Sequence, residues 1–179
     1  MNILNIHGYQ GTPQNAACSA LQALGCNVIS PAIDYDSISP QELLQTLRQT
    51  VREQKTEMLA GTSYGGFYAA VLSAELHLPV ILVNPCLLPF LHLPRLGFQQ
   101  DILPLVPLFG SLSGIDRNIV RCIIGADDEI IDTHDFTQNL LGSEHCRIIP
   151  GGKHSGATLP LEAYFREVLP GMTAETAAF

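Results

Sequence analysis

EMLAGTSYGGFYAA, residues 57–70, is the stretch of this 179-residue chain that determines its fold. Its apolar start is typical of a buried strand and its alanine-rich end of a helix, with glycines between them. Gly61, Ser63 and Gly65 match the pattern G-x-S-x-G, in which a serine lies on a sharp strand-to-helix turn. The glycines are needed because larger side chains there would collide with a neighbouring strand or helix. Ser63 is therefore a candidate nucleophile; the alternative is a glycine-rich turn with an idle serine.

Strands and helices alternate on both sides of this turn. We expect strands at 3–6, 27–29, 57–60, 79–83, 119–124 and 147–149, and helices at 13–24, 40–54, 66–76, 133–141 and 159–168. The second helix has a clear start, because Ser39 can cap it, Pro40 suits its first position and Glu42 can complete a capping box. The alternation predicts an α/β fold: a three-layer α/β/α sandwich with a mostly parallel sheet of about six strands.

One connection is longer than usual. Residues 85–116 are rich in leucine, proline, phenylalanine and glycine, and insertions of this length are commonly lids or binding loops. We expect a single domain over 1–179 with a lid in this insertion, and a frayed tail from Gly171 onward. Leu87, Leu88 and Phe90 follow a strand end, where α/β sheets form their substrate crevice, so they are candidates for an acyl pocket. The alternative is that these side chains complete the core.

A serine hydroxyl needs a base to remove its proton and an acid to orient that base. In enzymes with this turn motif, the acid and then the histidine can follow the nucleophile along the chain. Of six histidines, only His154 lies on a glycine-rich loop after the last strand, and it is the predicted base; the others are assigned structural or solvated positions. Four acidic residues follow the fifth strand: Asp127, Asp128, Glu129 and Asp132. Asp128 is the favoured acid and Asp127 the nearest alternative, and the three not chosen are expected to be solvated.

Ester hydrolysis also needs two N–H donors for the oxyanion. One candidate is the backbone N–H of Tyr64, directly after the serine. The loop that follows the first strand offers the backbone N–H of Tyr9 as the second, unless His7 and Gly8 simply turn the chain. No H-E-x-x-H or G-x-x-x-x-G-K-[ST] pattern indicates a metal or phosphate site, and the five cysteines form no C-x-x-C pair. We expect neither metal nor cofactor.

Together these segments resemble the small bacterial YqiA/YcfP-like esterase family. The resemblance rests on residues 7–9, 61–69, 83–85, 128–132 and 151–154 and covers nearly the whole chain. It implies an α/β-hydrolase fold and a triad of Ser63, Asp128 and His154. The chain departs from the family pattern at four positions: Thr62 and Tyr64, where Ser and Leu are frequent, Lys153, where Asn is usual, and Gly156, where an aromatic residue is common.

Composition excludes other classes of function. Seventeen acidic residues against nine Lys and Arg give a formal charge of −8, with no basic cluster, so nucleic acid is not an expected partner. The start of the chain has no basic segment followed by an apolar region, and the apolar stretches are short or broken by proline; we expect no secretion signal and no membrane span. Scattered cysteines in odd number fit a reducing cytoplasm, which is the predicted location.

The sequence thus predicts a serine hydrolase that cleaves carboxylic esters or thioesters of small to medium acyl groups through an acyl-enzyme, with a small-molecule substrate. One alternative is an acyltransferase or peptidase with the same triad. Another is a non-catalytic protein that grips an apolar partner through residues 85–116. The natural acyl group, the leaving group and the oligomeric state are left open.

Overall fold

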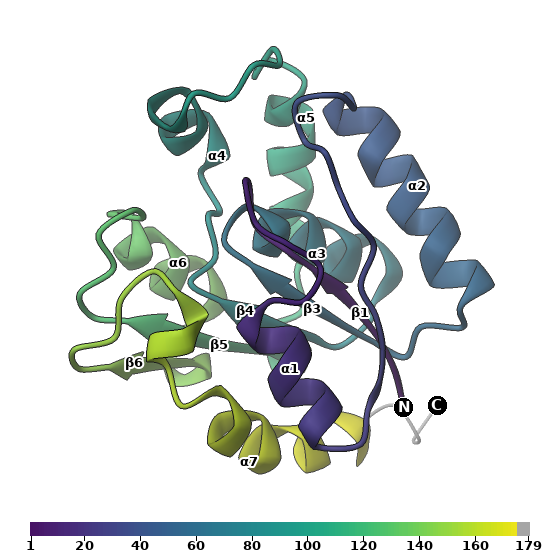
Figure 1. Ribbon diagram of the computed structural model, residues 1–179, viewed down its shortest axis with the longest axis vertical. Coiled ribbons are helices and arrows are strands. Elements are labelled where there is room, and N and C mark those ends of the chain that lie inside the picture. Colours follow the sequence, from purple (N-terminus) through teal and green to yellow (C-terminus); the bar gives the residue numbers. More distant parts are fainter. Residues whose placement is uncertain (175–179) are drawn as a thin grey trace.

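The computed structural model describes residues 1–174. Its centre is a six-stranded sheet in the order β2-β1-β3-β4-β5-β6, and every neighbouring pair is parallel (Figure 1). The strands are β1 (Asn2–Ile6), β2 (Asn27–Ile29), β3 (Met58–Thr62), β4 (Val80–Val83), β5 (Val120–Gly125) and β6 (Cys146–Ile149). The predicted parallel sheet is therefore confirmed, with strand ends within two residues of the expected ones.

Helices cover both faces of the sheet. They are α1 (Ala16–Ala23), α2 (Pro40–Glu53), α3 (Tyr64–Leu76), α6 (His134–Leu141) and α7 (Leu161–Ala174), with the short helices α4 (Pro89–His92) and α5 (Leu105–Gly110) in the long insertion. Alternate strand residues enter two separate cores, as the two-residue period of a strand requires: Leu4 and Leu82 pack with α2 and α3, whereas Ile3 and Ile81 pack with α1 and α7. The three-layer α/β/α sandwich is confirmed.

Two helix starts show how local chemistry sets the boundaries. Ser39 caps α2 and makes the complete capping box with Glu42, as predicted. Helix α1 begins at Ala16 rather than at the expected Pro13, because the Asn15 side chain accepts the Cys18 N–H (2.8 Å) and caps the helix there. The earlier start was wrong by three residues.

The last helix extends further than expected. Helix α7 continues through Pro170 to Ala174, and Leu169 and Met172 are buried in the core formed with α1. The expectation of a frayed tail is wrong for residues 171–174, because this burial holds the last turn against the sheet. Residues 175–179 lie outside the described part of the chain.

The insertion over 85–116 is folded and partly embedded. It contains α4, α5 and the 3₁₀ turns Leu93–Leu96 and Ser111–Gly114. Leu93, Leu105 and Leu112 are buried in the same core as α2 and α3. Figure 1 shows α4 and α5 standing away from the sheet at the top of the view. Within residues 1–174 no helix combines the length and apolar character needed to cross a membrane.

Candidate active site

Ser63 lies on the turn between β3 and α3, in a conformation that L-residues rarely adopt (φ 53°, ψ −123°). The glycines on either side are required by close packing. A Cβ on Gly65 would overlap the Ile6 carbonyl group of β1, and one on Gly61 would come within 2.7 Å of the Ala69 Cβ. Hydrogen bonds then fix the turn, because the Ser63 carbonyl oxygen accepts the N–H groups of Gly66 and Cys86 (2.9 Å each).

The structure brings three predicted residues into one hydrogen-bonded series. The Nε2 atom of His154, on the loop after β6, lies 3.0 Å from Ser63 Oγ. The Nδ1 atom of the same ring lies 3.0 and 2.9 Å from the two carboxylate oxygens of Asp128. Only 8% of Ser63 and 1% of the Asp128 side chain are exposed, against 20% of the His154 side chain. The imidazole thus lies between a shielded hydroxyl and a buried carboxylate.

Asp128 is saturated with hydrogen-bond donors. Oδ1 accepts the backbone N–H groups of Ile130 and Ile131 (2.9 Å each), and Oδ2 is 2.8 Å from Nε2 of His134. Burial raises the pKa of Asp128, but the hydrogen bonds from His134, His154 and the two backbone N–H groups lower it more, and the pKa is held well below its usual range. Asp128 is therefore ionised at neutral pH.

The other carboxylates of the acidic segment have different surroundings. Asp127 is exposed, as expected of a solvated residue. The Glu129 carboxylate accepts the backbone N–H of His154 at 3.1 Å. For Asp132, Oδ1 lies 2.9 Å from Nε2 of the buried His92, and Oδ2 lies 3.4 Å from Nη1 of Arg95. All three are exposed, as expected of solvated residues, but Glu129 and Asp132 also make contacts that the sequence did not predict.

Asn84 determines where the His154 loop lies, a function the sequence analysis did not assign to it. It follows β4 with a positive φ of 42° and is fully buried. Its Nδ2 donates to the carbonyl oxygens of Lys153 and His154 (2.8 Å each), and its Oδ1 accepts the Gly125 N–H at 2.7 Å. The signal that could have identified it is a polar residue directly after an entirely apolar strand.

The loop after β1 passes beside Ser63. A Cβ on Gly8 would lie 3.0 Å from Ser63 Cβ. The His7 ring holds this loop, since Nε2 accepts the Ile33 N–H (3.1 Å) and Nδ1 lies 2.8 Å from the Gly8 carbonyl oxygen. His7 has the structural function expected of it. Among residues 1–174, no hydrogen bond is made by the backbone N–H of Tyr9 or Tyr64, the two predicted oxyanion donors.

The three candidates for an acyl pocket have different positions. Leu87 is 1% exposed and packs in the same core as α2 and α3. Its position matches the alternative considered from the sequence, that these side chains complete the core. Leu88 and Phe90 are half-buried at the start of α4. The Phe90 ring packs edge-on against Phe109 of α5, with centroids 5.3 Å apart.

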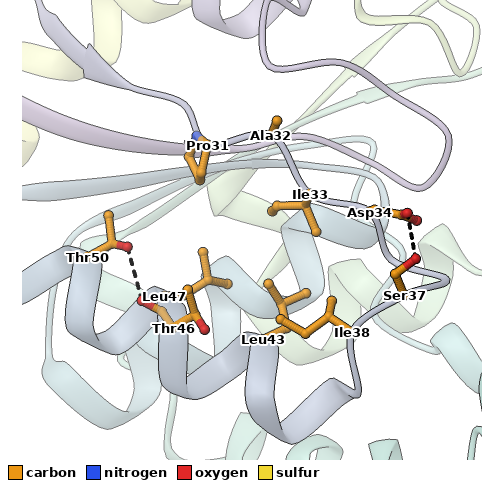
Figure 2. Close-up of a pocket in the computed structure, with 10 residues that line it drawn as sticks. All are labelled: Pro31, Ala32, Ile33, Asp34, Ser37, Ile38, Leu43, Thr46, Leu47 and Thr50. Atoms are coloured by element: carbon orange, nitrogen blue, oxygen red, sulfur yellow. Dashed lines mark hydrogen bonds between the residues drawn. The ribbon is translucent and has the colours of Figure 1, made fainter.

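Two cavities are lined by other parts of the chain. One of about 300 Å³ is lined by residues that include Asn15, Thr62 and Ser155. Thr62 precedes Ser63 in the sequence, and Ser155 follows His154. A second, of about 220 Å³, lies between α2 and the preceding loop; Figure 2 shows Ile33, Leu43 and Leu47 turned toward it. Neither was predicted. Over the described range 1–174, no group of His, Cys, Asp or Glu is arranged to hold a metal ion.

Comparison with solved structures shows a common fold. A protein from Xanthomonas campestris pv. campestris described as a hydrolase of the alpha/beta superfamily is 18% identical, with a TM-score of 0.59, and the match covers 99% of this chain and 98% of that one. The thioesterase domain from the curacin biosynthetic pathway is 15% identical (TM-score 0.63; 94% and 90% covered). EstE7, a homologue of hormone-sensitive lipase from a metagenome library, is 14% identical (TM-score 0.64; 97% and 78% covered).

A family model matches more than half of the chain, over residues 2–102, and its description is "Uncharacterised protein family (UPF0227)". The matched segment contains Ser63 and Asn84 and ends before Asp128 and His154. Together with the fold, this match confirms the resemblance to the YqiA-like family that the sequence indicated. The chain belongs to UPF0227, and its own fold is that of the α/β hydrolases.

Proposed function

We propose that this protein is a serine hydrolase that cleaves carboxylic esters or thioesters of small to medium acyl groups through an acyl-enzyme. One observation carries the proposal: the continuous series from Ser63 Oγ through both ring nitrogens of His154 to the buried carboxylate of Asp128. The distances are those over which a base can take a hydroxyl proton while an acid orients the base.

The proposed reaction has two halves. Ser63 Oγ attacks the acyl carbon while His154 Nε2 takes the hydroxyl proton, and Asp128 stabilises the imidazolium. The backbone N–H groups of Tyr9 and Tyr64 hold the oxyanion. The C–O or C–S bond then breaks, and the leaving group departs with the proton from His154. Water, deprotonated by the same imidazole, hydrolyses the acyl-enzyme and restores Ser63.

The relatives of known structure support this class of reaction. They include a thioesterase domain and metagenome-derived lipolytic enzymes of the same fold. The geometry also argues against a vestigial site in a binding protein. The strained backbone at Ser63 costs folding energy, and a protein that only grips an apolar partner has no use for that strain.

Covalent labelling with a fluorophosphonate tests the proposal directly. We expect one molecule of probe per chain, located at Ser63 by mass spectrometry, and no label in Ser63→Ala. Ser19→Ala, which changes an exposed serine of α1, is the matched control and should label like the wild type. In a p-nitrophenyl ester assay Ser63→Ala should lose several orders of magnitude in kcat, as when other triad members are removed. An unlabelled wild type, or full activity in Ser63→Ala, overturns the proposal.

The same assay separates hydrolysis from the other triad reactions. Adding a small alcohol or a thiol to the ester reaction diverts the acyl group if the protein is an acyltransferase, and the transferred product is then detected by chromatography. A hydrolase releases chiefly the free acid. Cleavage of peptides without cleavage of esters would favour a peptidase.

A further inference from the structure

Asp128 has a second imidazole beside it that the proposed reaction does not use. His134 is the first residue of α6, and its side chain is 13% exposed. Its Nε2 lies 2.8 Å from Asp128 Oδ2, the oxygen that is also 2.9 Å from His154 Nδ1. The carboxylate therefore lies between two histidines. From the sequence, a structural or solvated position was expected for His134.

The surroundings of the ring fix which nitrogen carries the proton. Within residues 1–174, the buried Nδ1 of His134 has no hydrogen-bond partner. A proton on Nδ1 would be a buried donor without an acceptor, which costs more than an idle lone pair. The nitrogen that donates to Asp128 is therefore Nε2.

We propose that His134 is a positioning residue of the hydrolase site, an inference that rests on the proposed function. Its hydrogen bond fixes the Asp128 carboxylate and takes up part of its negative charge. Less of that charge is left to stabilise a proton on His154, so His154 is free to act as a base at lower pH than it would beside an unshared carboxylate.

The other titratable groups around the carboxylate do not replace this donor. Burial, and then the nearby charge of Asp128, raises the pKa of the Cys86 thiol to about 12, so it stays neutral. The Glu129 carboxylate accepts the backbone N–H of His154 and lies near the positive charge of Lys153. Its negative charge is the same whether or not residue 134 has a hydrogen-bond donor. The effect of changing His134 can therefore be assigned to its own hydrogen bond.

The pH dependence of kcat/KM for a p-nitrophenyl ester tests this function. His134→Phe keeps a ring but removes the donor, and His134→Asn has a donor too short to reach Asp128. In both we expect the acidic limb of the profile to move up by about half a unit to one unit, with kcat about tenfold lower and KM little changed. His134→Gln places an N–H near the position of Nε2 and should keep the wild-type limb.

His92→Phe is the matched control, because it breaks a different histidine–aspartate pair, that of His92 with Asp132. Only Asp132 of this pair is on the loop that carries Asp128, since His92 ends α4. The acidic limb of His92→Phe should not move. If the limb is unmoved in His134→Phe and His134→Asn, or moves equally in His92→Phe or His134→Gln, the inference is wrong and His134 only packs α6. Fluorophosphonate labelling of the wild type keeps this result separate from the proposed function: a labelled wild type with unmoved limbs rejects His134 alone, whereas an unlabelled wild type rejects the hydrolase. If His134→Phe does not fold, His134→Asn decides.

Discussion

Replacing Asn84 by alanine removes three hydrogen bonds from the fully buried junction between β4, β5 and the His154 loop. Two come from its Nδ2 to the carbonyl oxygens of Lys153 and His154, and the third is the Gly125 N–H to its Oδ1. At about 0.5–1.5 kcal/mol each, they contribute about 3 kcal/mol. Alanine at a positive φ adds about 1 kcal/mol of strain that asparagine tolerates better. The free energy of unfolding should therefore fall by about 4 kcal/mol, which corresponds to a Tm about 8–16 °C lower.

Urea denaturation of three variants separates these contributions. Asn84→Gly loses the same hydrogen bonds without the strain and should be about 1 kcal/mol less destabilised than Asn84→Ala. Asn84→Asp keeps the shape but turns a carboxylate oxygen toward two carbonyl oxygens, so it should be the least stable above pH 5 and recover on acidification. In all three, kcat should fall more than KM rises, because the loop that carries the base is loosened. An Asn84→Ala protein within 1 kcal/mol of the wild type, with unchanged kcat, would refute the argument that this side chain holds the site together.

Three other predictions test the acid and the substrate. Asp128→Asn should reduce kcat/KM far more than Asp127→Asn, measured on the same ester; the reverse order would move the acid by one residue. The pKa of Asp128 is lowered in the folded protein, so the stability that this carboxylate contributes is fully present above about pH 4 and is lost as the pH falls further. Asp128→Asn should therefore make the Tm decline less steeply with falling pH, and an unchanged slope would contradict this. If Leu88 and Phe90 line an acyl pocket, extending p-nitrophenyl acetate to the butyrate adds two methylenes, about 1.6 kcal/mol, or about fifteenfold in kcat/KM. Leu88→Ala or Phe90→Ala should reduce that gain, and a flat or falling series from acetyl to hexanoyl removes both residues from the substrate site.

What could be predicted from the sequence is what is determined locally. The turn at Ser63 is set by glycines two residues away on either side, and the start of α2 by a capping box within four residues. Both were predictable because their physical causes lie inside a short window. The helix at Asn15 was misjudged by three residues because Pro13 is also a common helix-start residue, and only the observed cap distinguishes the two.

The partners of Asp128 and His154 depend instead on the paths of loops. The contact of His134 with Asp128 needs a loop that folds back within six residues, and the contact of Asn84 with the His154 loop spans 70 residues. Neither path is determined by composition or periodicity. Leu87 and Leu88 are neighbours of the same type, yet one lies in the core and the other is half-buried. A segment rich in leucine and proline has no regular period that would tell these positions apart.

The hydrogen bond between Ser63 and His154 joins residues 91 positions apart, and this separation has a consequence for folding. A chain that has paired β1, β3 and β4 already has its serine on the turn, but it has no base until β5 and β6 have added to the sheet. Closing so long a loop is slow compared with forming α3. If Ser63 is the proposed nucleophile, its reaction with a covalent probe reports when β5 and β6 have docked. During refolding, capture of a fluorophosphonate should lag behind the burial of Tyr64 and Tyr68, two tyrosines of α3 that are among the largest fully buried side chains of the protein.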